Sequence, residues 1–369
     1  MNSESPQSRM RRYIQMVATG PELSKSLDQD QARDGVAMIL RGEVDAVRAG
    51  IFLIALRMKR ETDDENIGAL EALQDAMERR VARAPRVVAI ADPFNGYLRG
   101  LPATPFLPAV LAACGLPSYM HGLEAVGPKY GITAHQVLKA AGKRVDLDPD
   151  EAVACLDDPD IGWCYIDQAS YQPGLHDLVE LRDIMVKRSC LSTLEVVLKP
   201  LSGAKSTCLM TGFVHKAYPP VYASLARHAG FDAAAIVRGV EGGCVPSLSQ
   251  VSRYFGYSGT SELEMIKLSP KTCGINQEQR AVPVKEGCKD AVEQSALGST
   301  HVLQPVVDEL VEAALAALGN QPGLFLDSLV YGGAIALRQF CGMDLDAAAA
   351  RVRSAIGSGA AKERFEAAP

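Results

Sequence analysis

The sequence predicts an α/β protein in which a small, all-helical domain precedes a larger domain built around a mainly parallel sheet. Two observations support this prediction. The chain up to residue 77 carries helical periodicity alone, whereas beyond it short apolar runs rich in β-branched residues alternate with alanine-rich segments. At 369 residues, 47% of them hydrophobic and 22% charged, the chain is long enough and apolar enough for two globular domains.

The N-terminal segment reads as a series of helices. Apolar side chains recur at helical spacing between residues 32 and 40, and Gly42 ends that pattern. A second helix is expected over residues 45–59. Thr62-Asp63-Asp64-Glu65 forms a capping box that should open a third helix over residues 65–83.

The next stretch predicts a strand, a loop, a helix and a second strand. Residues 87–91 form a short apolar run that suits a buried strand, and Asp92 stands at its carboxyl end. The loop over residues 92–105 leads into an apolar helix over residues 106–114. In α/β folds ligands, and phosphates especially, bind at such a loop. The alternative is that this loop only connects two elements.

The remaining chain continues the mixed pattern. Residues 260–268 and 281–284 are poorly patterned and are expected to be a β-meander or irregular. A weak helix is expected over residues 287–296. Further strands are expected over residues 117–120, 162–169, 206–214 and 233–239, the last ending in a glycine turn. Further helices are expected over residues 133–141, 146–155, 175–198, 218–228, 302–318, 326–339, 344–357 and 359–368.

Composition limits the classes of function. The net charge of −6 excludes a generic polyanion binder, so any nucleic-acid surface must be a local patch. The nine cysteines form no C-x-x-C pair, and their number is odd, which favours reduced thiols over a disulfide framework or a zinc site. No signal peptide and no membrane-length apolar run are visible, so a cytoplasmic protein without a membrane partner is expected.

The order of these segments resembles anthranilate phosphoribosyltransferase and its relatives in glycosyltransferase family 3. The resemblance rests on the helical start, on the strand that ends in His121-Gly122, on Gly131 to Gly142, and on Asp327-Ser328-Leu329 and residues 354–361 near the end. It implies a helical domain of residues 1–83 completed by helices from about 172–200. The α/β domain would comprise residues 84–170 and 201–369, with the active site between the domains, and the protein would be a homodimer.

The chemistry that the resemblance implies is pentosyl transfer from a donor such as phosphoribosyl pyrophosphate (PRPP) to an aromatic nitrogen or, in related members, phosphorolysis of a pyrimidine nucleoside. A catalytic protein of this kind would use Mg²⁺ as cofactor. Such a site needs a glycine-rich backbone cradle for pyrophosphate and acidic residues for the metal ions. The resemblance implies Arg182 as the residue that faces the acceptor and Glu241 as a metal ligand. The candidates for binding phosphate or ribose are Asp92, Asn95, Gly96, Arg99, Thr104, His121, Lys129 and Arg238.

Several family motifs are altered in this sequence. The family's G-T-G-G-D loop corresponds to Pro93-Phe94-Asn95-Gly96-Tyr97, and its N-I-S-T to Pro102-Ala103-Thr104-Pro105. The K-H-G-N-R motif becomes Met120-His121-Gly122-Leu123-Glu124, and the magnesium-binding D-E pair falls near Gly242-Gly243-Cys244. These changes remove parts of a phosphate cradle and of a metal site, so efficient anthranilate transfer is not expected.

Two hypotheses for the function follow. The altered loop and turn resemble a transferase-like branch of the family, some members of which are implicated in nucleic-acid binding. The first hypothesis is a phosphoribosyltransferase-fold enzyme of altered specificity. The second is a non-catalytic nucleic-acid-binding relative that uses a basic patch between residues 187 and 227, formed by Lys187, Arg188, Lys199, Lys205, Lys216 and Arg227. The alternative for the patch is that these cations are scattered over the surface.

Overall fold

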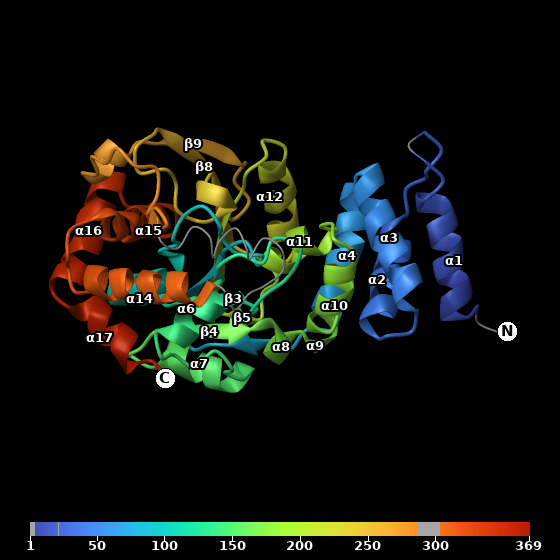
Figure 1. Ribbon diagram of the computed structural model, residues 1–369, viewed down its shortest axis with the longest axis horizontal. Helices are drawn as coiled ribbons and strands as arrows, with labels where there is room; N and C mark the ends of the chain where they lie inside the picture. Colours follow the sequence, from blue (N-terminus) through green and yellow to red (C-terminus); the bar gives the residue numbers. More distant parts are fainter. Residues whose placement is uncertain (1–3, 21, 287–302) are drawn as a thin grey trace.

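A computed structural model describes residues 4–20, 22–286 and 303–369. A helical bundle lies at one end of the long axis of the molecule, and a larger α/β domain lies at the other (Figure 1). The predicted fold class is confirmed: a small N-terminal helical domain is joined to a domain with a mainly parallel sheet.

The bundle is built from locally well-specified helices. Its first four are α1 (Pro6–Val17), α2 (Gln29–Leu40), α3 (Ala46–Lys59) and α4 (Asp63–Asp75). The capping box predicted at Thr62 is present, because its hydroxyl accepts from the backbone N–H of Glu65 while the Glu65 side chain accepts from that of Thr62. The apolar faces of these helices bury Phe52, Leu53, Leu70 and Leu73 in one core.

The larger domain contains a seven-stranded sheet in the order β4-β3-β2-β6-β7-β8-β9. The first five strands in that order run parallel, and β8 and β9 are antiparallel additions at one edge. The strands are β2 (Arg86–Ala91), β3 (Ser118–Gly122), β4 (Trp163–Asp167), β6 (Ser206–Gly212), β7 (Ala233–Val237), β8 (Ser252–Ser258) and β9 (Glu264–Leu268). The run predicted around residues 87–91 is therefore a central strand, β2.

Alternate residues of the central strands point into two different cores. Ile90 and Met120 face one cluster, whereas Ala89 and Tyr119 face the cluster that continues into the helical bundle. The helices of this domain are α5 (Leu107–Ala113), α6 (Ala134–Ala140), α7 (Pro149–Asp157), α8 (Gln168–Tyr171), α12 (Tyr218–His228), α14 (Gln304–Leu318), α15 (Leu324–Cys341), α16 (Leu345–Gly357) and α17 (Ala360–Ala367). Both faces of the sheet are thus buried, as continuous apolar strands require.

The chain crosses between the bundle and the sheet at hydrogen-bonded connections. Strands β1 (Arg80–Val81) and β5 (Leu201–Ser202) pair in parallel, and the N–H of Glu78 donates to the carbonyl of Tyr171 at 2.8 Å. Three short helices lie between two of these connections: α9 (Pro173–His176), α10 (Val179–Ile184) and α11 (Leu191–Leu194). In Figure 1 they lie against α4 and the rest of the bundle.

Some expected elements differ from those observed. The helix expected over residues 65–83 ends at Asp75, because the N–H groups of Arg80 and Ala82 pair with residues 200 and 202 instead. The helix expected over residues 175–198 is divided at Val186, whose φ of +57° is not helical. The poorly patterned stretch before Leu268 contains strand β9, and the weak helix expected over residues 287–296 lies outside the described residues.

The eight cysteines in the described part of the chain are all unpaired. Among the helices described, none combines the length with the apolar character that a bilayer span requires.

We expect Gly68→Ala to destabilise the bundle, because a Cβ atom there would lie 2.1 Å from the carbonyl oxygen of Gln29 on α2. Overpacking of this kind typically costs about 1–3 kcal/mol. Gly50→Ala on α3 is a matched control: its nearest atoms, on Leu181 and Met185, would lie 3.7 Å away. Urea denaturation should show a lower free energy of unfolding for the Gly68 variant alone. Equal stability of the two variants would contradict the close packing of α2 on α4.

Candidate functional site

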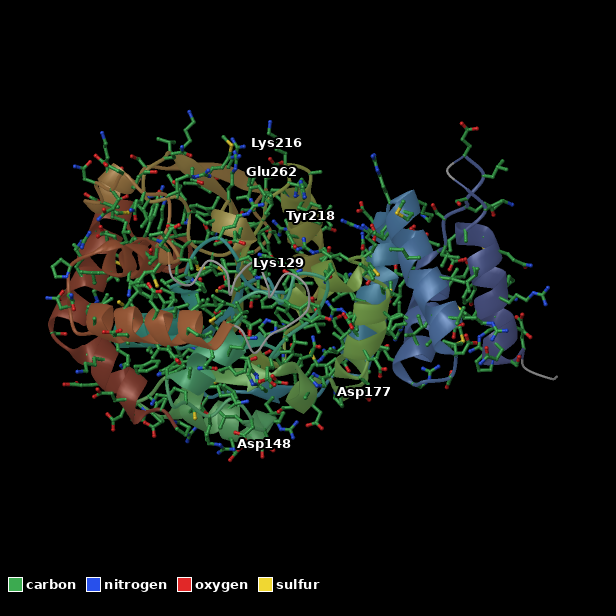
Figure 2. The ribbon with its side chains drawn as sticks, viewed as in Figure 1. Lys129, Asp148, Asp177, Lys216, Tyr218 and Glu262 are labelled. Carbon is green, nitrogen blue, oxygen red and sulfur yellow. The ribbon has the colours of Figure 1, made fainter. Side chains whose placement is uncertain are left out.

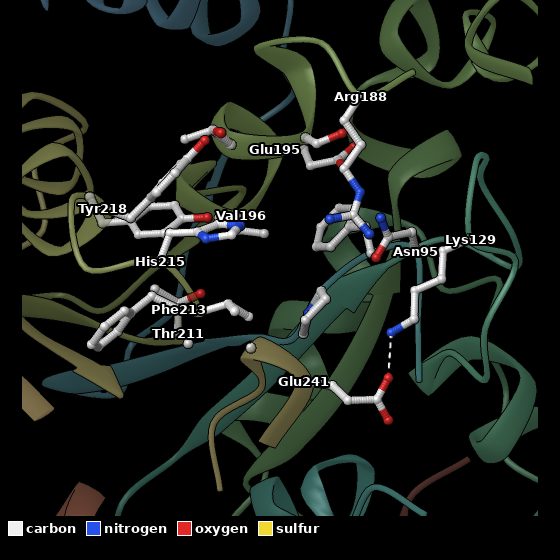
Figure 3. A pocket seen from close by; sticks show the side chains of 18 of the residues that line it. Asn95, Lys129, Arg188, Glu195, Val196, Thr211, Phe213, His215, Tyr218 and Glu241 are labelled. Carbon is white, nitrogen blue, oxygen red and sulfur yellow. Dashed lines mark hydrogen bonds and ion pairs between the residues drawn. The ribbon is translucent and has the colours of Figure 1, made fainter. Parts of the chain in front are cut away.

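A cavity lined by many polar side chains lies where the parallel strands end and the bundle begins. The cavity has a volume of about 530 Å³. The loops after β2, β6 and β7 line it, together with residues 188–196 and Arg57 of α3. It therefore lies at the carboxyl edge of the sheet, between the two domains, where ligands bind in folds of this class. Figure 3 shows this pocket from close by.

Arg188 projects into the pocket from the segment between α10 and α11, and Asn95 meets it from the loop after β2. With its amide oxygen turned to the guanidinium, Asn95 accepts from Nε and Nη2 of Arg188 at 2.9 and 3.0 Å. Asn95 is buried, whereas Arg188 is exposed. The amide thus fixes one edge of the guanidinium, and the group keeps further N–H donors for an anion.

Glu241, in the turn after β7, binds the loop that follows β2. Its carboxylate accepts from the backbone N–H groups of Leu98 and Arg99, at 3.1 and 2.6 Å, and pairs with Nζ of Lys129 at 2.7 Å. Lys129 also donates to the carbonyl of Gly96 at 2.6 Å. Burial lowers the pKa of Lys129, and the charge of Glu241 opposes that shift.

The backbone of this loop has few N–H groups left for a ligand. The N–H of Gly96 donates to Pro93 at 2.8 Å, and that of Tyr97 to Ile132 at 3.0 Å. The next two N–H groups, of Leu98 and Arg99, donate to Glu241. Gly96 itself, at a φ of +72°, allows a close approach, because a Cβ there would lie 2.4 Å from the backbone of Gly131.

Asp92 lies behind the pocket in a buried polar cluster. Its carboxylate accepts from the backbone N–H of Cys244 at 3.1 Å and is hydrogen-bonded by the hydroxyls of Tyr97 and Thr104. Burial raises the pKa of Asp92, and these hydrogen bonds oppose the shift. Thr104 lines a separate, smaller cavity. Neither Asp92 nor Thr104 lines the main pocket.

His121 is also placed away from the pocket. It is buried among aromatic rings, and its Nδ1 is 3.0 Å from the hydroxyl of Tyr171. Burial lowers the pKa of His121 to about 3. The imidazole is therefore neutral in the folded protein and packs as part of the core.

Arg182, which was expected to face the aromatic acceptor substrate, forms an internal ion pair. Its two terminal nitrogens donate to the two oxygens of Glu195 at 2.7 and 2.8 Å, and both side chains are nearly fully buried. Glu195 lines the pocket but Arg182 does not. Removal of one partner from such a pair typically costs about 3–5 kcal/mol, since the other charge is left buried.

Arg238 and Arg99 line a second, more open cavity of about 620 Å³ together with Arg280. This cavity adjoins the first, because Arg99, Phe213, Val214 and Glu241 line both. Of the predicted phosphate residues, the structure therefore brings Asn95, Arg99 and Lys129 into one pocket and places Arg238 beside it.

The six cations of the expected nucleic-acid patch divide between two edges of the sheet. Lys187, Arg188 and Lys216 lie at the carboxyl edge, and Lys205 precedes β6 at the amino edge. Two others take part in tertiary contacts. Lys199 donates to the carbonyl of Gly230, and Arg227 donates to that of Gly259 at 2.7 Å and lies over the Tyr257 ring. Figure 2 shows Lys216 at the outer edge of the molecule, apart from Lys129 and Tyr218.

Sequence reasoning did not place several pocket residues in the site. Arg57 is expected only as part of the helix over residues 45–59, and Arg188 is expected in the basic patch. Thr211 lies near the end of strand β6, and Phe213 and His215 follow that strand. These three could have been found from the rule, applied above to β2, that ligands bind at the loop after a parallel strand. No sequence signal pairs Arg188 with Asn95, because 92 residues lie between them.

The residues present do not fit a protein-held magnesium site. Among the described residues, no group of three or more Asp, Glu, His or Cys side chains is arranged to hold a metal ion. The pocket carboxylates are already engaged, Glu241 by Lys129 and two backbone N–H groups and Glu195 by Arg182. Glu241 thus acts as a structural acceptor in this fold.

A helical bundle and an α/β domain lie on either side of a pocket lined by cationic side chains, and comparison with known proteins identifies the family. The chain belongs to the glycosyl transferase family: the model of its helical bundle domain matches residues 11–77, and that of its a/b domain matches residues 104–362. Within that family, the chain is similar to anthranilate phosphoribosyltransferases.

Particular relatives illustrate this similarity. The enzyme of Methylobacterium sp. (strain 4-46) is 32% identical over 189 residues, 51% of this chain and 53% of that protein. An uncharacterized protein of Aquifex aeolicus is 25% identical over 222 residues, 60% of this chain and 65% of its own length. The matches to the first anthranilate phosphoribosyltransferases thus span about half the length of those relatives.

Solved structures share the whole fold. Anthranilate phosphoribosyltransferase from Thermus thermophilus superposes with a TM-score of 0.73 at 17% identity, covering 97% of each chain. The Saccharomyces cerevisiae enzyme, in complex with PRPP and Mg, gives 0.74 at 15% identity, covering 97% of this chain and 96% of that one. At these identities the likeness establishes the fold.

We expect His121 to make the protein less stable in acid. The unfolded chain binds a proton at His121 below about pH 6.5, whereas the folded chain does so only near pH 3. The free energy of unfolding should therefore fall between these pH values, by up to about 1.4 kcal/mol per pH unit from this group. Denaturation across pH should show a shallower decline for His121→Asn than for wild type or for the exposed His215→Asn. Equal slopes for all three proteins would contradict a neutral, buried His121.

Proposed function

We propose that this protein transfers a pentosyl group from a phosphorylated ribose donor, of the PRPP type, to a nitrogen of an aromatic acceptor. We propose further that its acceptor is not that of the ordinary tryptophan-pathway enzyme. The observation that supports this proposal is the cationic pocket at the carboxyl edge of the sheet, in a chain of the glycosyl transferase family. Exposed guanidinium groups of Arg99 and Arg188 line it.

The proposed reaction is a displacement at C1 of the ribose. The lone pair of the acceptor nitrogen forms the new C–N bond, and the bond from C1 to the pyrophosphate oxygen breaks with its electron pair leaving on pyrophosphate. The proton of the acceptor nitrogen passes to water. Negative charge grows on the leaving group, and the N–H donors of Arg188 and Arg99 suit its phosphate oxygens.

The altered motifs support a changed manner of anion binding. Because the N–H groups of residues 96–99 donate to protein acceptors, side-chain cations replace the backbone cradle in this proposal. The S. cerevisiae relative was solved with PRPP and Mg. In this chain the pocket carboxylates do not fit magnesium, so we assign no step of the reaction to a metal ion.

We expect Arg188→Gln to weaken the binding of PRPP by about 10- to 100-fold, since a hydrogen bond to a charged group contributes about 1.5–3 kcal/mol. Lys205→Gln is the matched control, because Lys205 is exposed at the amino edge of the sheet. Isothermal titration calorimetry with PRPP, in EDTA and in millimolar magnesium, measures both effects. Absence of saturable binding to wild type in either buffer would sink the proposed function.

Nucleic-acid binding is the second candidate function, and one observation favours it. The main pocket shares Arg57, Lys129 and Arg188 with an adjoining cavity that Lys187 also lines, and it shares Arg99 with the cavity of Arg238 and Arg280. These adjoining cavities form a basic trough across the carboxyl edge of the sheet. Titration with single-stranded DNA distinguishes the candidates, because binding to a polyanion weakens steeply as salt rises.

We propose a homodimer that forms through the helical domain. Its support is a group of exposed apolar side chains on α3 and at the end of α10: Val47, Ile51, Met58, Ile184 and Val186. Contiguous exposed apolar surface usually marks an interaction site. Sedimentation velocity should show a dimer that Met58→Glu disrupts and that Val251→Glu, an equally exposed apolar position on the α/β domain, leaves intact. A wild-type monomer would refute the proposal.

We also propose the domain division implied by the resemblance: residues 1–83 with about 172–200 as one domain, and residues 84–170 with 201–369 as the other. The contact of Leu181 and Met185 with α3 supports it. A cytoplasmic location is proposed from the cysteine pattern of the sequence.

A further inference from the structure

The pocket has two walls of opposite character. Figure 3 shows Arg188, Asn95, Lys129 and Glu241 on one side, and Tyr218, His215, Phe213 and Val196 on the other. Charged and amide groups thus face rings and an aliphatic side chain across one cavity of about 530 Å³. A ligand that fills it has an anionic end and an apolar, ring-like end.

The ring wall is built at the start of α12. Tyr218 begins that helix and packs on the buried Tyr222, with ring centroids 5.7 Å apart and planes at 43°. His215 lies 6.1 Å from Tyr218 in the loop after β6. Tyr222 packs against Tyr218 and limits its movement. His215 is exposed, and Tyr218 is half-buried. Ring surface therefore remains accessible along the pocket.

The charges near this wall are already matched. Arg57 lies over the Tyr218 ring, with its guanidinium carbon 6.0 Å from the centroid, and pairs with Glu61 at 3.5 Å. Glu195, between the two walls in Figure 3, is paired with Arg182. An aromatic carboxylate would need a cation that these pairs do not supply. A neutral ring needs only the ring faces and hydrogen-bonding groups such as the Tyr218 hydroxyl.

Resting on the proposed pentosyl transfer, we infer that Tyr218 and His215 form the acceptor seat, and that the acceptor is a neutral nitrogen heterocycle of the nucleobase kind. The ring stacks on the Tyr218–His215 wall while the ribosyl phosphate lies against Arg188. Stacking on aromatic side chains tolerates many heterocycles because every base has a π-face. The wall selects for a planar neutral ring and against an aminobenzoate.

The test is calorimetry on the full chain with ribose 5-phosphate, AMP and UMP, which share the phosphate end and differ in the ring. We expect a nucleoside monophosphate to bind about tenfold more tightly than ribose 5-phosphate, the gain typical of one stacked base. Tyr218→Ala and His215→Ala should remove most of that gain and leave the affinity for ribose 5-phosphate unchanged. Tyr218→Phe should keep it.

Controls separate the outcomes. His228→Ala, at the far end of α12, should behave as wild type, and the exposed position of His215 gives a variant that should fold even if Tyr218→Ala does not. Excess anthranilate should not displace AMP. Equal binding of AMP, UMP and ribose 5-phosphate, or displacement by anthranilate, would overturn the inference alone. If wild type binds none of the three phosphates and no PRPP, the proposed function fails as well.

Discussion

The carboxylate of Glu241 is the group on which the arrangement of the pocket depends. It joins three segments that are distant in sequence: the turn after β7, the loop after β2, and Lys129 in the loop after β3. Hydrogen bonds to a charged group contribute about 1.5–3 kcal/mol each, and here one carboxylate accepts several of them. That total offsets the backbone strain of Glu241, a residue other than glycine at a φ of +52°.

This use of Glu241 has a chemical consequence for the rest of the site. A carboxylate that accepts from two backbone N–H groups and a lysine has little capacity left for a metal ion, and those N–H groups are lost to any phosphate. Tyr97 also holds the loop after β2 against the turn after β7. Its ring packs so closely on that turn that a Cβ at Gly243 would lie 1.6 Å from its hydroxyl. The proposed binding of an anion in this pocket therefore depends on guanidinium side chains.

The sequence was sufficient to predict features that depend on nearby residues. The apolar run around residues 87–91, the capping box at Thr62 and the strand–loop–helix that contains Asn95 all have local causes. Errors arose where distant segments decide the structure. The chain after Asp75 pairs with residues 200–202, which no helical pattern could indicate, and Val186 interrupts a helix that its composition favours. The candidate site shows the same contrast between local and long-range causes. The loop after β2 was expected to bind a ligand, but its contact with the distant Arg188 was not expected.

Arg182 and Arg188 show why residue type alone could not assign roles. Both are arginines in one segment beside the bundle, and the resemblance pointed to the first. Arg182 is buried, and a buried guanidinium must be paired, so Glu195 takes both of its terminal nitrogens and no donor remains on that edge for a substrate. Arg188 is exposed and held by the neutral amide of Asn95, which orients the guanidinium without cancelling its charge. Arg188 thus keeps an unmatched positive charge because its partner is neutral, whereas the charge of Arg182 is matched by Glu195. That difference leaves Arg188 as the arginine that is available to bind an anion.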